Sequence, residues 1–134
     1  RLLIGLGGTS GLTAEPSART NVIGVGKDAA DTTLQIMHND ASGACTKIDL
    51  GANFPANTDG TAYDVEFNCA PGMTSATYTV TRLDTAFTAT GTISTNLPVA
   101  STTGAIGVNA GTGPAIPGLG LRVAFMAAWA RSNL

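Results

Sequence analysis

A regular alternation of apolar and polar residues between positions 62 and 94 constrains the fold more than any other feature. Residues 62–70, 76–83 and 86–94 each carry an apolar side chain at nearly every second position. Successive side chains of a β-strand point to opposite faces of its sheet, so each segment has one apolar face and one wet face. Pro71-Gly72 and Asp84-Thr85 separate the three segments as turns. The sequence therefore predicts an antiparallel meander. Its apolar positions are Tyr63, Val65, Phe67, Cys69, Tyr78, Val80, Phe87, Ala89 and Ile93.

Five further short segments have β character. They cover residues 1–6, 21–26, 33–38, 46–51 and 105–109. Asn, Asp and Gly cluster between them, as in residues 39–43, and these residue types tolerate the positive φ that tight hairpins need. Short strands with turn signals about every 8–12 residues predict an all-β fold, a two-sheet antiparallel β-sandwich or jelly roll. A closed barrel is the alternative.

Composition agrees with a β-protein. Only 12% of the 134 residues are charged and 43% are hydrophobic, with 17 Gly among the rest. A helical bundle would need long runs of Leu, Ala, Glu and Lys instead. The length favours a single domain over residues 1–134. The first residue is Arg1 rather than Met, which fits a processed product or a part of a longer chain or assembly.

The last quarter of the chain is harder to assign. Residues 111–118 hold two Pro and three Gly, which disfavour both a helix and a central strand and predict a loop. Residues 119–130 fit a strand with Leu119, Leu121, Val123 and Phe125 on one face. A helix would align apolar residues equally well. The strand is preferred because a closing strand suits the β-rich chain before it.

Charge and hydropathy argue against two classes of partner. The formal net charge is −2, and no cluster of Lys or Arg exists that could neutralise a row of phosphates, so nucleic acid is not expected as a partner. No apolar run is long enough to span a bilayer, so no membrane is expected either. A secretory signal peptide is also not recognisable.

Few residues suggest reaction chemistry. The single histidine, His38, falls in phase with Leu34 and Ile36 and is expected to be a hydrogen-bonded structural residue. Ser42 and Cys45 are near it in sequence, but no Gly-x-Ser-x-Gly elbow is present. Cys45 and Cys69 are expected to be free buried thiols, and a disulfide between them remains the alternative. The chain is therefore predicted not to be an enzyme.

Carboxylates offer two further hypotheses. Asp64 and Glu66 share one face of a strand, and a solvated face explains them more simply than the facing pair of a glycosidase. Asp28, Asp31 and Asp40 occupy two turns and are weak candidates for a calcium site, because hard cations prefer loop oxygens. The EF-hand pattern and zinc spacings are absent, so no metal and no cofactor are expected.

The order of several motifs resembles a domain of tailed-bacteriophage virion proteins, found in tail fibres and related appendages. Residues 1–6 match an Arg-x-x-x-Gly-Leu strand, and residues 24–31 match a Gly-x-Gly-x-Asp-x-x-Asp stretch. Residues 38–43 form the His-Asn-Asp-x-Ser-Gly turn, residues 46–51 the Thr-Lys-hydrophobic-Asp-Leu-Gly strand, and residues 63–67 open the Tyr-containing meander. The first strand departs from the pattern because it lacks aromatic residues.

This resemblance implies a concanavalin-like jelly roll, similar to lectins and glucanases, located in the virion. It implies a non-enzymatic structural or attachment role, with other virion subunits as partners and a homo-oligomer around a symmetry axis, a trimer being favoured. Binding of a host-surface glycan is implied by analogy alone, and no catalytic residue carries over. The alternatives are a lectin-like domain that binds or cleaves glycans, and a capsid decoration protein.

Overall fold

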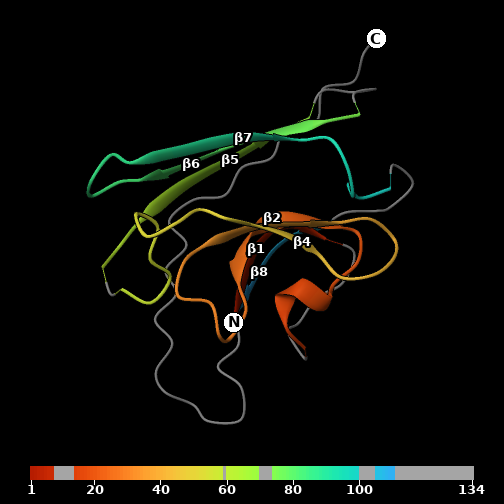
Figure 1. Ribbon diagram of the computed structural model, residues 1–134, viewed down its shortest axis with the longest axis horizontal. Helices are drawn as coiled ribbons and strands as arrows, with labels where there is room; N and C mark the ends of the chain where they lie inside the picture. The colour runs from red at the N-terminus through yellow and green to blue at the C-terminus, as the bar shows by residue number, and fades with distance from the viewer. Residues whose placement is uncertain (8–13, 59, 70–73, 100–104, 111–134) are drawn as a thin grey trace.

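The computed structural model describes residues 1–7, 14–58, 60–69, 74–99 and 105–110. These residues form eight β-strands and one turn of 3₁₀ helix. The strands make two antiparallel sheets that lie face to face (Figure 1). The predicted all-β, two-sheet antiparallel sandwich is therefore confirmed. No helix in this part of the chain is long and apolar enough to cross a membrane.

The larger sheet has five strands in the order β4-β3-β2-β1-β8. Its first four strands follow one another as a meander, and β8 returns from late in the chain to pair antiparallel with β1. The bounds are Leu2–Gly7 for β1, Val22–Lys27 for β2, Gln35–Asn39 for β3, Thr46–Asp49 for β4 and Ala105–Ala110 for β8. Strands far apart in sequence thus become neighbours.

The smaller sheet is the meander expected from the alternation. It has the order β5-β6-β7, with β5 at Tyr63–Asn68, β6 at Ala76–Arg82 and β7 at Thr88–Ile93. Exposure alternates along each strand, and the buried positions of the central strand β6 are Ala76, Tyr78 and Val80. The outward positions are mostly threonine, whose β-branched side chain suits a pleated surface.

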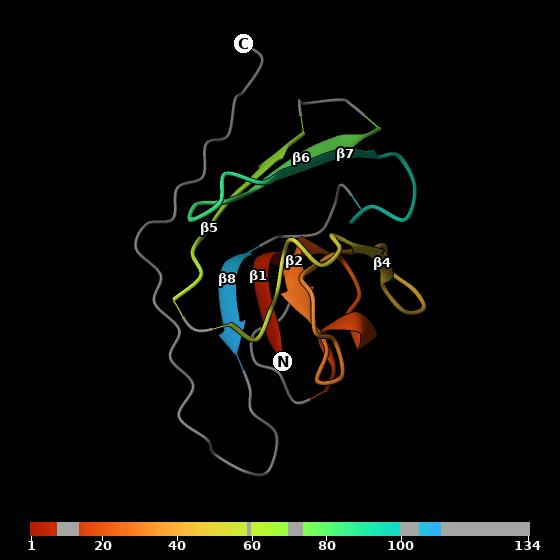
Figure 2. The same ribbon diagram turned by 60° about the vertical axis from the view of Figure 1, so that its left-hand side comes forward.

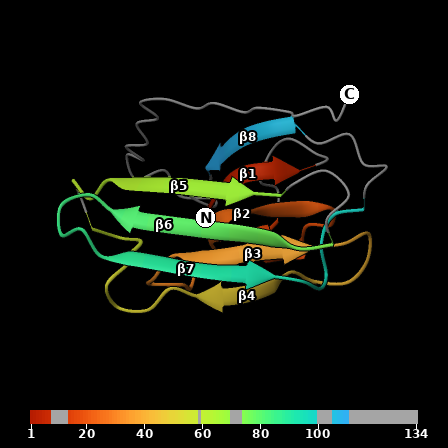
Figure 3. The same ribbon diagram turned by 90° about the horizontal axis from the view of Figure 1, so that it is seen from above.

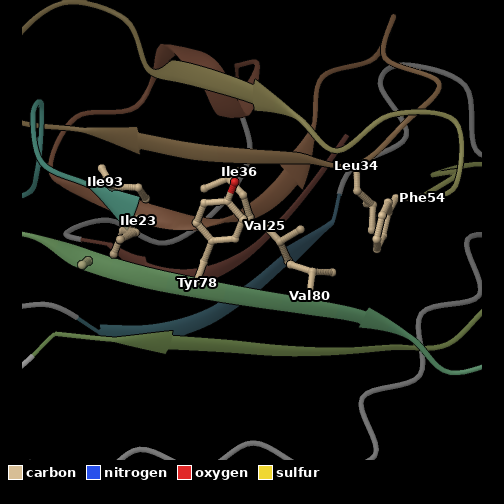
Figure 4. Packing of buried hydrophobic residues seen from close by; sticks show 9 residues of the cluster. Ile23, Val25, Leu34, Ile36, Phe54, Tyr78, Val80 and Ile93 are labelled. Atoms are coloured by element: carbon tan, nitrogen blue, oxygen red, sulfur yellow. The ribbon is translucent and has the colours of Figure 1, made fainter. Parts of the chain in front are cut away.

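The main core lies between the two sheets. Ile23 and Val25 of β2 and Ile36 of β3 face Tyr78 and Val80 of β6 (Figure 4). Ile36 and Val80 are both 0% exposed. Each fully buried aliphatic side chain contributes about 1.5–3 kcal/mol by leaving water, so this layer holds the sheets together.

The position of the Tyr78 ring requires a glycine on the neighbouring strand. It pairs across the strands with Gly91 of β7. A Cβ built on Gly91 would lie 2.5 Å from Tyr78 Oη and 2.6 Å from two ring atoms. The ring therefore lies directly over the glycine and covers its bare backbone.

A second apolar layer lies on the opposite face of the larger sheet. Leu3, Val22 and Met37 form it, with Cys45 packed beside them. The 3₁₀ turn η1 (Pro16–Ala18) lies on this side of the sheet in both views (Figures 1 and 2). Cys45 N–H donates to the carbonyl of Ser17 in η1 at 2.7 Å, which ties the cover to the sheet.

Two glycines let strands β1 and β2 approach closely. Gly5 pairs with Gly24. A Cβ on Gly5 would lie 2.2 Å from the carbonyl oxygen of Ile23, and one on Gly24 would lie 2.5 Å from the carbonyl oxygen of Ile4. Such distances leave no room for a side chain.

Two expected core positions are wrong. Cys69 was assigned to the apolar face of its strand, but β5 ends at Asn68 and Cys69 is exposed. Phe87 was assigned likewise, but it precedes β7 and is 47% exposed. Ala86 has φ 59°, and this left-handed residue breaks the alternation before Phe87. The expected loop at 111–118 and the strand or helix at 119–130 lie outside the described residues.

Candidate functional site

A group of charged side chains surrounds Lys47 in β4. Lys47 Nζ lies 3.0 Å from Asp28 Oδ2 and 2.6 Å from Asp31 Oδ2. It also donates to Asp31 Oδ1 at 2.8 Å. Asp28 and Asp31 belong to the loop after β2, where Asp28 N–H donates to Asp31 Oδ2 at 2.8 Å. The loop thus closes on itself and turns both carboxylates toward one ammonium group.

The charges at this site reinforce one another. Partial burial raises the pKa of Asp28, but hydrogen bonds from Ser17 and Lys47 outweigh it and bring the pKa below the ordinary 3.8. Partial burial lowers the pKa of Lys47, but hydrogen bonds to Asp31 and Asp28 outweigh it and raise the pKa above 10.5. Asp28 and Lys47 are therefore both charged at neutral pH.

The network continues into the segment that covers the larger sheet. Ser17 N–H donates to Asp28 Oδ1 at 3.0 Å. Glu15 accepts from Arg1 Nε at 2.9 Å and from Ala29 N–H at 2.8 Å. These bonds join the start of the chain, the η1 cover and the β2–β3 loop. These bonds hold the three segments together.

The three calcium candidates do not come together. Asp28 and Asp31 follow the end of β2, whereas Asp40 follows the end of the antiparallel neighbour β3, at the opposite end of the strand pair. Lys47 supplies the positive charge beside Asp28 and Asp31. Across the described residues, no group of three or more His, Cys, Asp or Glu side chains could hold a metal ion.

His38 faces the inter-sheet side and is 3% exposed. Its Nδ1 lies 3.0 Å from the carbonyl oxygen of Asn96, and a carbonyl can only accept, so Nδ1 carries a proton. Asn96 Nδ2 donates in return to the carbonyl of His38 at 3.3 Å and to Thr46 Oγ1 at 3.0 Å. Asn96 Oδ1 accepts from Asp40 N–H at 3.0 Å. His38 is therefore on the core side and hydrogen-bonded, as the sequence predicted.

The nucleophiles near His38 in sequence have other partners. Ser42 donates its hydroxyl to Asp40 Oδ1 at 3.2 Å. Cys45 Sγ lies 3.4 Å from the carbonyl oxygen of Arg19, and burial raises its thiol pKa to about 11. A thiol with that pKa holds very little thiolate at neutral pH, so it is a poor nucleophile. Cys45 is only half-buried and Cys69 is exposed, and neither thiol is in a disulfide.

Asp64 and Glu66 lie on the outward face of the smaller sheet. Thr81 stands opposite Asp64 on β6, and Thr79 stands opposite Glu66. The two carboxylates therefore lie side by side on an open surface, as a solvated strand face would have them. We call this surface the threonine face; its side chains are Asp64, Glu66, Asn68, Thr77, Thr79, Thr81, Thr88, Thr90 and Thr92.

Two organising residues were not found from the sequence. Lys47 joins Asp28 to Asp31, and Asn96 joins His38 to Asp40. One local signal existed for Asn96, because Asn tolerates the left-handed backbone that it adopts here with φ 51°. For Lys47 no local signal exists, since its carboxylate partners lie on another loop.

Comparisons with known proteins add no relative. No protein-family model matches the chain, and neither a curated protein nor a solved structure does.

Proposed function

We propose that this chain is a non-enzymatic structural or attachment domain of a tailed-bacteriophage particle, as in a tail fibre or related appendage. The observation that carries the proposal is the bonding between the motifs of the resemblance. Lys47 of the Thr-Lys strand binds Asp28 and Asp31, the two aspartates of the Gly-x-Gly-x-Asp-x-x-Asp stretch. Because these motif residues bind one another, their recurrence in a family can be explained by the fold they stabilise, without any substrate.

The His-Asn-Asp turn has the same character. Asn39 is 0% exposed, and its Nδ2 donates to the carbonyls of Arg19 at 2.6 Å and Gly43 at 3.0 Å. Its neighbour His38 is bound to Asn96. The polar side chains of Asn39 and His38 therefore hold loops in place. This suits a structural domain that is assembled into a particle, and it requires no catalytic role for them.

Assembly around a symmetry axis, as a trimer, belongs to this proposal. The connection between β6 and β7 exposes Leu83 by 59% and Phe87 by 47%. Large apolar side chains at a hairpin end become buried when subunits meet. They support a contact with other copies or with other virion subunits.

Light scattering of the purified domain over a wide concentration range tests the assembly. We expect a trimer, whose dissociation is promoted by Leu83→Ser combined with Phe87→Ser. Immunogold electron microscopy of the particles that carry the chain tests the location: label on tail appendages is expected. A monomer at all concentrations contradicts the assembly, and label on the head favours a capsid decoration protein.

A second function, contact with a host-surface glycan, is favoured by the threonine face. Six hydroxyls and three carboxylate or amide groups point outward from three adjacent strands. Such groups can exchange hydrogen bonds with sugar hydroxyls. A glycan array, with released sugars assayed in parallel, tests this. We expect binding without sugar release, weakened by Thr79→Val and Thr90→Val, which keep the side-chain shape; silence on the array removes this function.

A further inference from the structure

The outer face of the larger sheet is covered by a short segment of chain. Seen from above, β5, β6 and β7 lie over one face of this sheet (Figure 3), and the apolar layer of Leu3, Val22 and Met37 lies on the other face. Residues 14–19, which include η1, lie on that second side (Figures 1 and 2). We call residues 14–19 the strap.

Apolar contact alone holds the strap weakly. Pro16 is the buried residue of η1, whereas Ala14 and Ala18 are exposed. The hydrophobic stabilisation of a segment scales with the apolar area that it buries, and a single buried proline offers little of it. Hydrogen bonds therefore decide whether the strap stays on the sheet.

Two carboxylates bind one end of the strap. Glu15 accepts from Arg1 Nε at 2.9 Å and from Ala29 N–H at 2.8 Å. Asp28, on the loop after β2, accepts from Ser17 N–H at 3.0 Å. Hydrogen bonds to an ionised carboxylate are stronger than those to a neutral group. Protonation of Glu15 and Asp28 therefore weakens this end of the strap.

The charged groups around Asp28 keep it ionised at neutral pH. Lys47 Nζ lies 3.0 Å from Asp28 Oδ2 and also binds Asp31. Partial burial raises the pKa of Asp28, but hydrogen bonds from Ser17 and Lys47 bring it below 3.8. Cys45 beside it adds no charge, because burial raises the pKa of its thiol to about 11.

Glu15 is ionised for similar reasons. The Ala29 N–H lowers the pKa of Glu15 below the ordinary 4.5, and Arg1 adds to this effect, while burial and the charge of Asp28 oppose it. A carboxylate whose pKa is lowered in the closed state favours closing above its ordinary pKa, and this gain is lost as the pH falls through the lowered value. The strap is therefore bound at neutral pH and loses both carboxylate contacts in acid.

The other end of the strap is held by uncharged groups. Asn39 Nδ2 donates to the carbonyl of Arg19 at 2.6 Å. Just beyond the strap, Asn21 N–H donates to the carbonyl of Asp40 at 2.6 Å. Acid does not protonate these amides and carbonyls, so this end stays fixed when the carboxylates at the other end lose their charge.

We propose that the strap is released by acid: protonation of Glu15 and Asp28 frees residues 14–17, while the far end of the strap stays on the sheet. The movement breaks one further bond, from Cys45 N–H to the carbonyl of Ser17 at 2.7 Å. It uncovers the apolar layer and the Cys45 thiol, and both sheets keep their strands. Neutral pH thus hides a surface that acid exposes.

Labelling of Cys45 tests the release. In the Cys69→Ser protein, Cys45 is the remaining thiol, and dipyridyl disulfide reacts with thiols in acid as well as at neutral pH. We expect the labelling rate, relative to that of the urea-unfolded protein at the same pH, to rise several-fold as the pH falls below 3.8, with an unchanged circular dichroism spectrum. A relative rate that stays constant until the spectrum itself changes would overturn the proposal.

Removing one charge should release the strap without acid. Glu15→Gln keeps the shape of the side chain, and we expect several-fold faster labelling of Cys45 at neutral pH, with a smaller dependence on pH. Glu66→Gln, on the threonine face, is the matched control and should change neither quantity. Labelling of Glu15→Gln at the rate of the parent protein contradicts the proposal.

Hydrogen exchange distinguishes release of the strap from a general loss of stability. In Glu15→Gln we expect reduced protection at the amides of Ser17, Ala29 and Cys45, and unchanged protection in β2 and β3. Reduced protection spread evenly over both sheets would mean that the substitution weakens the whole fold, and this result also overturns the proposal.

Discussion

His38 and Asn96 bind each other through two hydrogen bonds, although they are 58 positions apart in the sequence. The imidazole Nδ1 donates to the carbonyl of Asn96, and the amide of Asn96 donates to the carbonyl of His38. His38 belongs to β3 of the larger sheet, and Asn96 follows β7 of the smaller one. This reciprocal pair therefore fastens the two layers at one end of the sandwich.

Removing the Asn96 side chain should destabilise the fold. Asn96→Ala loses three side-chain hydrogen bonds, each contributing about 1 kcal/mol, and places alanine at φ 51°. We expect a loss of about 4 kcal/mol in the free energy of unfolding, because alanine in the left-handed backbone adds about 1 kcal/mol to the loss of the three bonds. Urea denaturation followed by circular dichroism measures the free energy of unfolding.

A glycine at the same position separates the two causes. Asn96→Gly also loses the side-chain bonds but tolerates the positive φ. It should therefore be about 1 kcal/mol more stable than Asn96→Ala. Thr95→Ala, at the exposed neighbouring position, should stay close to wild type. Equal stability of Asn96→Ala and wild type would show that the hydrogen bonds of the Asn96 side chain contribute nothing to the stability of the fold.

The glycines of the β1–β2 pair give a prediction with an internal control. Gly5→Ala would bring a methyl group to 2.2 Å from the carbonyl oxygen of Ile23, so the strands must separate. We expect a loss of about 2–3 kcal/mol, as for other overpacked sites. At Gly7, on the same strand, the nearest atom to a new Cβ is Val22 Cγ2 at 3.5 Å, an ordinary contact.

Gly7→Ala should therefore be neutral or slightly stabilising, since it restricts the unfolded chain. Thermal unfolding of the two variants side by side is sufficient. If both alanines cost the same, the close approach at Gly5 is not a determinant of stability.

The ion pairs of Lys47 predict a defined pH window. The pKa of Asp28 is lower in the fold than 3.8, so its stabilising effect is present above that pH and disappears as the pH falls through the folded value. The pKa of Lys47 is raised above 10.5, so its effect is present below that pH and disappears as the pH rises through the folded value.

Lys47→Met should accordingly lower stability by about 1–2 kcal/mol at neutral pH, because two carboxylates lose a partly exposed cation. The difference from wild type should shrink below pH 3.8 and above pH 10.5. Tm measured as a function of pH for both proteins checks this. A difference that is constant across pH would assign the loss to packing of the lysine stem instead.

How much of the fold was readable from sequence depended on the range of the interactions. The alternation in β5, β6 and β7 is local, and it correctly predicted the meander and its buried residues Tyr78 and Val80. In the sequence, Phe87 continues the same alternation of apolar and polar residues. The left-handed residue Ala86 displaced it, and alanine gives no local signal for that conformation.

The candidate site was less predictable, for the same reason. His38 was correctly expected to lie on the core side with a hydrogen bond, because its phase with Ile36 is a local property. The role of Lys47 depends on a loop 16 to 19 positions away, and that of Asn96 on a strand in the other sheet. The pairing of β1 with β8 is longer still in range, and no periodicity encodes it.

The two thiols should react at very different rates. Burial raises the pKa of Cys45 to about 11, and its Sγ lies against the carbonyl of Arg19. Cys69 is exposed beyond the end of β5. Because thiolate is the reactive form, we expect a disulfide reagent at pH 8 to label Cys69 rapidly and Cys45 only as the fold opens.

Titration of native and urea-unfolded protein measures this, with one fast equivalent in the folded state and two after unfolding. Cys69→Ser should abolish the fast phase, and Cys45→Ser should leave it intact. A fast phase that survives Cys69→Ser would mean that the cover formed by η1 opens often enough to expose Cys45. The segment anchored by Glu15 and Ser17 would then be the least stable part of the sandwich.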